Sequence, residues 1–170
     1  MDRADHGAVA GKVGQAIALQ VVAFDVAGET FGTDIACVRE ITRVTNLARV
    51  PGSGPDVEGV MNLRGKIIPV VNLRRRLGMA SAARTESSRI IVAEIAEARA
   101  RAGTGRLTAF MVDRVHEVLR LTRAQVAPLP LLVACSIPPE FIAGVGTPQD
   151  RLIILLDLGK VFATPTSVAA

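Results

Sequence analysis

The chain contains few aromatic and few thiol side chains. Its 170 residues include no Trp, no Tyr, five Phe and two Cys. Without Trp or Tyr it lacks the stacking surface on which many proteins bind single-stranded nucleic acid. Cys37 and Cys135 lie far apart in apolar surroundings. We therefore predict reduced core thiols in a cytoplasmic protein, not a disulfide scaffold.

Long apolar runs and metal-ligand spacings are also missing. No uninterrupted apolar stretch reaches the ~18 residues of a membrane helix. Residues 1–15 mix charged residues with glycines and lack a basic segment followed by an apolar one, so we predict no signal peptide and no membrane insertion. His6 and His116 stand at no ligand spacing with either cysteine. We expect no metal and no cofactor.

Candidates for catalysis are few. Asp113 and Glu117 lie four residues apart in a segment expected to be a strand, so they need not share a face. Cys37 lies two residues from Arg39, whose charge can lower a thiol pKa, but no base accompanies it. Without a glycine-rich phosphate loop or a Ser-His-Asp set, we predict no enzymatic activity, and a Cys37 enzyme is only an alternative.

Short apolar runs are what the chain does contain. Hydrophobic residues make up 49% of it, and Val, Ile and Leu runs alternate with Gly and Pro, which predicts many short strands. Arg64-Gly65 predicts a two-residue hairpin turn in which the glycine has positive φ. Pro69 predicts an edge strand or a bulge. The spacing within Ile35–Ile41 predicts a helical turn, and Asn72 is the expected N-cap of a helix over Leu73–Leu77.

The positive charge is modest. There are 20 Lys and Arg against 16 Asp and Glu, which gives a formal net charge of +4. The one basic run, Arg74-Arg75-Arg76, falls in the helix predicted after Asn72. A solvent-exposed helix face is the first interpretation, and a patch for an acidic partner or nucleic acid is the second.

The chain also repeats itself. Residues 59–73 match residues 144–158, from a Gly-Val pair at the start to an Asn-Leu or Asp-Leu pair at the end, and residues 38–41 match residues 115–118. A true repeat predicts two similar β-units, each closed into a barrel, and a chance match of apolar strands is the alternative.

The predicted organisation follows from this repeat. Residues 1–15 form a flexible leader, residues 16–162 the folded domain and residues 163–170 a flexible tail. The two halves of the domain run roughly over 16–80 and 88–162, with some exchange of strands.

The longest motif runs from Gly59 to Arg74 and reads Gly-Val-Met-Asn-Leu-Arg-Gly-Lys-Ile-Ile-Pro-Val-Val-Asn-Leu-Arg. It closely resembles the signature of the CheW family of chemotaxis coupling proteins. Shorter likenesses on both sides follow in the family's order, so the resemblance spans about residues 17 to 162. The family usually has Asp at the position of Asn72. This change keeps an N-cap but removes a carboxylate.

The resemblance implies an all-β fold of two packed, five-stranded SH3-like barrels, a few short helices and no catalysis. It implies an adaptor between the cytoplasmic signalling tips of chemoreceptors and the regulatory domain of the histidine kinase CheA, supporting array assembly and control of kinase autophosphorylation. Such a protein is cytoplasmic, monomeric in isolation and recruited to membrane-associated receptor arrays.

The resemblance also implies two sets of contact residues. The receptor-facing set is Val38, Glu40, Gly59, Asn62 and Arg64. In it, valine offers an apolar contact, glycine a close backbone approach and arginine a planar five-donor fork, while the glutamate selects a cation or orients the arginine. Core packing and an ordinary exposed turn are the alternatives for the valine and the arginine.

The kinase-facing set is Val115, Leu131, Leu132 and Gly144. The two leucines follow two prolines in an expected loop. They either form an exposed apolar patch or tuck under the loop.

Two other functions remain open beside the adaptor, which binds no nucleic acid. One is a basic β-barrel module that binds nucleic acid. The other is a relative of the family that serves a signalling array outside chemotaxis.

Overall fold

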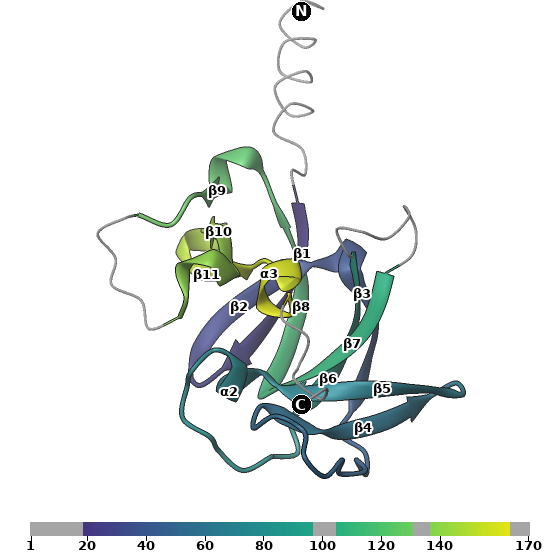
Figure 1. The fold of residues 1–170 in the computed structure, drawn as a ribbon. Coiled ribbons are helices and arrows are strands. Elements are labelled where there is room, and N and C mark those ends of the chain that lie inside the picture. Colours follow the sequence, from purple (N-terminus) through teal and green to yellow (C-terminus); the bar gives the residue numbers. More distant parts are fainter. Residues whose placement is uncertain (1–18, 97–104, 131–136, 164–170) are drawn as a thin grey trace, which may run out of the picture.

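The computed structural model describes residues 19–96, 105–130 and 137–163 and folds them into two β-sheets that pack on each other (Figure 1). The predicted leader, residues 1–15, lies outside the described residues, as does the predicted tail, 163–170, apart from its first residue. Strands dominate because the apolar runs are short and are separated by glycine and proline.

One sheet comes from the middle of the chain and has the strand order β3-β6-β7-β5-β4. Its elements are β3 (Val38–Arg43), β4 (Val57–Leu63), β5 (Lys66–Asn72), α2 (Leu73–Arg76), β6 (Arg89–Ala96) and β7 (Gly105–Val112). We call these elements the central unit. A β-bridge between Ala48 and Val60 joins the segment after β3 to β4 and closes the barrel.

The other sheet draws its strands from both ends of the described chain, in the order β8-β1-β2-β11-β10-β9. We call it, with its helices and turns, the terminal unit. Its strands and helix are β1 (Leu19–Val26), β2 (Glu29–Asp34), β8 (Arg114–Leu121), β9 (Val126–Ala127), β10 (Ile142–Gly146), β11 (Ile153–Leu156) and α3 (Leu158–Val161). Its short 3-10 turns are η1 (Ile35–Cys37), η2 (Arg123–Gln125), η3 (Pro139–Phe141) and η4 (Pro148–Asp150).

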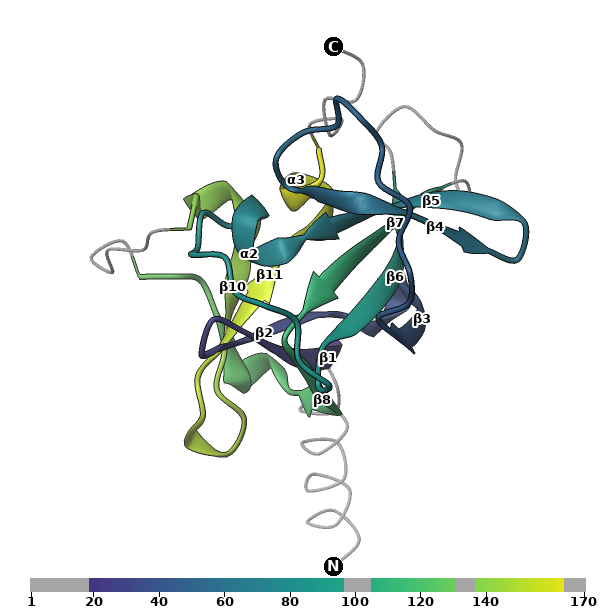
Figure 2. The ribbon, with the colours of Figure 1, turned by 90° about the horizontal axis from the view of Figure 1, so that it is seen from below.

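The two units share one strand arrangement, in agreement with the predicted repeat. The order β8-β1-β2-β11-β10 corresponds to β3-β6-β7-β5-β4, and in each unit a hairpin is joined in parallel to the next strand. The prediction allowed some exchange of strands between the halves 16–80 and 88–162, and in the structure β1, β2, β6 and β7 are the strands that cross. β1 and β2 complete the terminal unit because β2 pairs with β11, while β6 and β7 complete the central unit. Figure 2 shows the strands of the two sheets on opposite sides of the molecule.

Local predictions had mixed outcomes. The Arg64-Gly65 hairpin is confirmed, because Leu63 pairs with Lys66 across it. The helical turn covers only η1, and the following residues form β3, which pairs with β6. Pro69 does not lie on an edge strand: β5 is flanked by β4 and β7. Its missing N–H is tolerated because the ladder with β7 begins only at Val70.

The largest core lies between the units. Four phenylalanines form a continuous row across it, with ring centroids 5.7 to 6.1 Å apart: Phe31, Phe24, Phe110 and Phe162. Each unit also encloses a smaller cluster of its own, around Ile68 and Val92 in the central unit and around Val21 and Ile153 in the terminal unit. Burial of apolar surface therefore both closes each barrel and fixes one barrel to the other.

Candidate functional site

The tip of the β4–β5 hairpin presents Arg64 to solvent. Arg64 and Gly65 have φ of 52° and 85°, as a type I′ turn requires. The side-chain oxygen of Asn62 accepts a hydrogen bond from the Gly65 N–H at 2.9 Å. Arg64 is exposed and its guanidinium makes no hydrogen bond or ion pair with any other described residue. The fold thus holds the turn and leaves the cation available.

Val38 and Glu40 lie on β3, across a bulge from each other in its ladder with β6. Val38 is half-buried and packs against the shared core, and Glu40 is also half-buried. No hydrogen bond or ion pair joins Glu40 to Arg64 among the described residues. The structure therefore does not show Glu40 orienting Arg64.

Gly59 is buried, and the backbone of Ala48 packs directly against it. A Cβ at Gly59 would lie 2.6 Å from the Ala48 carbonyl oxygen. The close approach that we expected a partner to make is made by the chain itself, at the bridge that closes the central barrel.

The structure places two of the four predicted kinase-facing residues in the terminal unit. Val115 on β8 packs against the shared core, and Gly144 on β10 is buried, with the Ala127 carbonyl oxygen 2.8 Å from where its Cβ would be. These positions are equivalent to Val38 and Gly59 in the central unit. Leu131 and Leu132 lie outside the described residues.

An apolar cleft of about 560 Å³ opens between the units and is lined by Cys37, the residue before Val38, and the sequence did not predict it. Its walls come from the start of β1, the end of β6, the end of β11 and the start of α3. They include Leu19, Cys37, Ile95, Ala96, Leu156 and Leu158. Two carboxylates, Asp34 and Asp157, also line it. The sequence shows only that several of the predicted strands begin or end with apolar residues, and it does not show that these ends meet.

Cys37 lines this cleft and is not set up as a nucleophile. Burial raises the pKa of the Cys37 thiol, and Asp34 raises it further, while Arg39 only partly opposes them. Arg39 lowers the pKa of this thiol, as predicted, but burial and Asp34 outweigh it.

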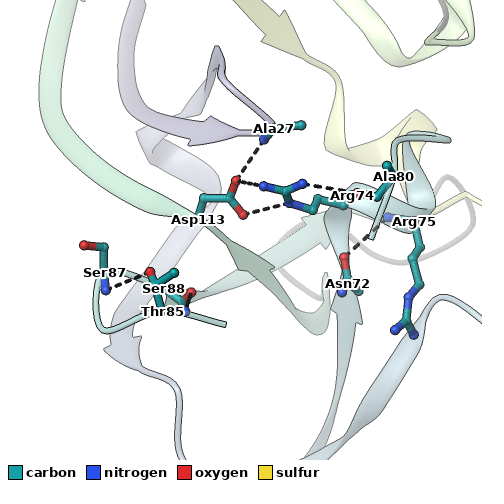
Figure 3. A network of polar contacts seen from close by, with 9 residues as sticks. All are labelled: Ala27, Asn72, Arg74, Arg75, Ala80, Thr85, Ser87, Ser88 and Asp113. Atoms are coloured by element: carbon teal, nitrogen blue, oxygen red, sulfur yellow. Dashed lines mark hydrogen bonds and ion pairs between the residues drawn. The ribbon is translucent and has the colours of Figure 1, made fainter. Parts of the chain in front are cut away.

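The arginine run is neither a solvated face nor a free patch. Arg74 makes a two-point ion pair with Asp113, with Nε–Oδ1 and Nη2–Oδ2 distances of 3.0 and 2.5 Å, and also donates to the Ala80 carbonyl (Figure 3). Oδ2 of Asp113 accepts a second bond from the Ala27 N–H at 2.9 Å. Burial would raise the pKa of Asp113, but the hydrogen bonds from Arg74 and Ala27 and the charge of Arg74 hold it below its ordinary value.

The other two arginines are also engaged. Arg76 Nε donates to the Val161 carbonyl at 2.7 Å, and its guanidinium lies 5.9 Å from the centre of the Phe141 ring. Arg75 stays within the central unit, where it donates to the Pro55 carbonyl and to Ser81 Oγ. Each of the three arginines thus binds a different set of acceptors within the protein. The interpretation of the run as a solvent-exposed helix face was wrong.

Four large apolar side chains are exposed in the part of the chain that the structure describes, and they form equivalent pairs. Ile41 and Ile67 in the central unit are 40% and 65% exposed, and Val118 and Leu152 in the terminal unit are 48% and 62% exposed. Ladder register makes Ile41 equivalent to Val118.

Within residues 19–96, 105–130 and 137–163, no helix is long and apolar enough to cross a bilayer. In the same ranges, no three His, Cys, Asp or Glu side chains gather as a metal site would require.

Comparisons with known proteins agree with this architecture. The family model described as the CheW-like domain matches residues 20–165. A chemotaxis protein CheW from Rhizobium meliloti is 32% identical over 89% of this chain and 92% of its own length. One from Thermotoga maritima is 33% identical over 84% of this chain and 86% of its own length.

A solved structure is similar over the same region. The scaffolding protein TtCheW from Thermoanaerobacter tengcongensis superposes with a TM-score of 0.76 at 32% identity, covering 88% of this chain and 95% of that one. Nothing in these comparisons favours a nucleic-acid module, an enzyme or an array outside chemotaxis. The chain belongs to the CheW-like family and is a non-catalytic chemotaxis coupling adaptor.

Proposed function

We propose that this chain couples the cytoplasmic tips of chemoreceptors to the regulatory domain of the histidine kinase CheA. It does so in the cytoplasm, as a monomer that is recruited into receptor arrays at the membrane. Its relatives are named chemotaxis proteins, and one is named a scaffolding protein. An adaptor of this kind needs two separate surfaces, and the two units supply them.

The receptor-facing surface comprises the β3 edge, the cleft beside it and the β4–β5 tip. Arg64 makes the polar contact with a carboxylate or a helix carbonyl, and Val38, which follows the cleft residue Cys37 in the chain, makes the apolar one. Asn62 and Gly59 act indirectly, because the first holds the turn and the second admits Ala48. Glu40 faces a cation of the partner.

The cleft accommodates the apolar face of a receptor helix. Its aliphatic walls provide the apolar surface that such a helix must bury, and Asp34 and Asp157 attract a basic side chain on that helix.

The kinase-facing surface lies on the terminal unit around Val115 and Gly144, and Leu131 and Leu132, which belong to the same predicted set, lie outside the described residues. Exposed Val118 and Leu152 make the apolar contacts there. An ion pair of 3.5 Å between Glu117 and Arg151, their chain neighbours, brings the two segments together.

The observation that carries the receptor half of the proposal is the free guanidinium of Arg64, since Arg74, Arg75 and Arg76 are all engaged. The test is a titration of the protein against a receptor cytoplasmic fragment and, separately, against a CheA regulatory domain. Arg64→Glu is expected to lose the receptor and keep the kinase domain. Arg84→Glu makes the same charge change at another exposed, unpaired arginine and keeps both. Failure of the folded wild-type protein to bind either partner would refute the proposal.

A further inference from the structure

The Arg74–Asp113 ion pair and the apolar cleft lie at opposite ends of the joint, the interface between the units. Leu19 and Val21 line the cleft at the start of β1, while Ala27, which binds Asp113, directly follows its end. Seven residue steps at about 3.3 Å place the two ends of β1 roughly 23 Å apart. The shared phenylalanine core lies between them.

The β6–β7 ladder gives the same placement independently. Ile95, in the cleft wall, pairs with Arg106 at one end of that ladder. Val112, next to Asp113, pairs with Arg89 at the other end. The joint therefore has a closed end, where Arg74 and Asp113 are paired, and an open end, where the cleft lies and where Arg106 also donates to the Phe162 carbonyl at 2.6 Å.

Asp113 links the two units at the closed end. It stands between β7 of the central unit and β8 of the terminal unit. Its carboxylate accepts from Arg74 of the central unit and from the Ala27 N–H of the terminal unit. A guanidinium and a carboxylate joined by two hydrogen bonds have less freedom to rotate relative to each other than groups joined by one.

We propose that Arg74 and Asp113 are positioning residues for partner docking: their ion pair closes one end of the joint and thereby sets the width of the cleft at the other end. Because the packed core between the two ends is stiff, a change of angle at the closed end is transmitted as a displacement of the cleft walls. The link to docking rests on the proposed function, in which a receptor helix occupies the cleft.

The first test measures the cleft without any partner. In a Cys37→Ser, Cys135→Ser background, spin labels at Ala96→Cys and Gly159→Cys report the distance across the cleft, since both positions line it and both are exposed. Arg74→Gln and Asp113→Asn are expected to shift and broaden the distance distribution. Arg75→Gln, on the same helix but bound only within the central unit, is expected to leave it unchanged.

Variants that remain folded keep the test decisive. Arg74→Lys retains the charge without the fork and is expected to give a smaller shift than Arg74→Gln. Circular dichroism and urea unfolding confirm that each variant is folded. Identical distributions in the wild-type protein, Arg74→Gln and Asp113→Asn, or an equal shift in Arg75→Gln, would overturn the proposal.

The second test measures affinity for a receptor cytoplasmic fragment. Arg74→Gln is expected to bind roughly five- to tenfold more weakly, and Arg75→Gln as tightly as the wild-type protein. If the distances shift but the wild-type protein binds no receptor fragment, the positioning role of Arg74 stands and the proposed function fails. If the distances stay fixed while receptor binding is intact, the proposed function stands and the positioning role fails.

Discussion

Helices α2 and α3 occupy equivalent places in the two units but bear very different side chains. Each begins after a side-chain cap, Asn72 or Asp157, that accepts a backbone N–H three residues on. Each then buries a leucine in the shared core, Leu73 or Leu158. The residues that follow are three arginines in α2 but Gly159, Lys160 and Val161 in α3. The cap and the leucine are enough to form the turn, so the following positions are free for other uses.

Because these positions differ between the two helices, the two units contribute different groups to the interface between them. Arginines of the central unit cross to acceptors of the terminal unit, because Arg76 reaches the Val161 carbonyl and Arg106 reaches the Phe162 carbonyl at 2.6 Å. Helix α3 contributes carbonyls at its end, which suit a cationic donor. At its start, Gly159 brings no side chain and the cleft remains open. In these contacts the arginine donors come from the central unit and the carbonyl acceptors from the terminal unit.

The largest predicted effect tests whether the two units close their barrels in the same way. Gly59→Ala and Gly144→Ala each force a Cβ to within 3 Å of a backbone carbonyl, Ala48 or Ala127. We expect losses in free energy of unfolding of about 3 kcal/mol for Gly59→Ala and about 2 kcal/mol for Gly144→Ala, measured by urea unfolding. The first is larger because Gly59 also has a φ of +155°.

Gly52→Ala is the control for these two variants, since Gly52 has positive φ but open space around its Cβ position. It should cost about 1 kcal/mol. Equal losses at all three glycines would show that the close carbonyl contacts are unimportant.

The two helix caps provide the next comparison. Asn72 is buried and its Nδ2 donates to Glu58 Oε1 at 2.7 Å. Asn72→Asp, which restores the residue usual in the family, keeps the cap but sets two carboxylates against each other. We expect it to cost about 1 kcal/mol in urea unfolding near neutral pH.

Two further variants isolate that cause. Glu58→Gln combined with Asn72→Asp should recover the loss, and the equivalent change in α3, Asp157→Asn, should be close to neutral. If Asn72→Asp is as stable as the wild-type protein, the bond to Glu58 does not explain why this chain departs from the family pattern.

The ion pair between Arg74 and Asp113 predicts that the stability of the protein depends on pH. Because the pKa of Asp113 is lowered in the folded protein, the stability gained from it is present above the ordinary carboxyl pKa and is lost as pH falls through the folded value. The advantage of the wild-type protein over Asp113→Asn should therefore shrink below about pH 4.

Thermal unfolding from pH 7 to pH 3 measures this difference, which we expect to be at most about 1 kcal/mol because the pair is partly exposed. Arg84→Gln, at an exposed arginine that makes no ion pair with any described residue, should differ from the wild-type protein by the same amount at every pH. A constant difference for Asp113→Asn over the whole range would contradict the assignment.

Much of this fold was predictable because its signals are local. The Arg64-Gly65 turn and the caps at Asn72 and Asp157 depend on a few adjacent residues, and the repeat is visible in the sequence. The assignment of β1 and β2 to the terminal unit was not predictable, since pairing of β2 with β11 joins residues far apart in the chain. The engaged arginines were misjudged for the same reason, because their partners lie in distant segments.

In the candidate site too, local features were predictable and contacts between distant segments were not. The motif located Arg64 and the tip, but the roles expected of Gly59 and Gly144 depended on what fills the space beside them. That space is occupied by Ala48 and Ala127, which no local pattern indicates. The cleft could not be predicted either, because its walls come from both sheets.

The smallest predicted effect compares the two-residue turns of the units. Ala27-Gly28 and Arg64-Gly65 both place a non-glycine residue at positive φ, 53° for Ala27 and 52° for Arg64. Relief of that strain, partly offset by the greater chain entropy of glycine, predicts that Ala27→Gly and Arg64→Gly each stabilise the protein by about 0.5 kcal/mol in urea unfolding. Only Arg64→Gly should also lose the receptor fragment, because Ala27 contributes its backbone N–H and glycine keeps it. A stabilised Arg64→Gly that still binds the receptor fragment at full affinity would show that the strained arginine is retained for some other reason.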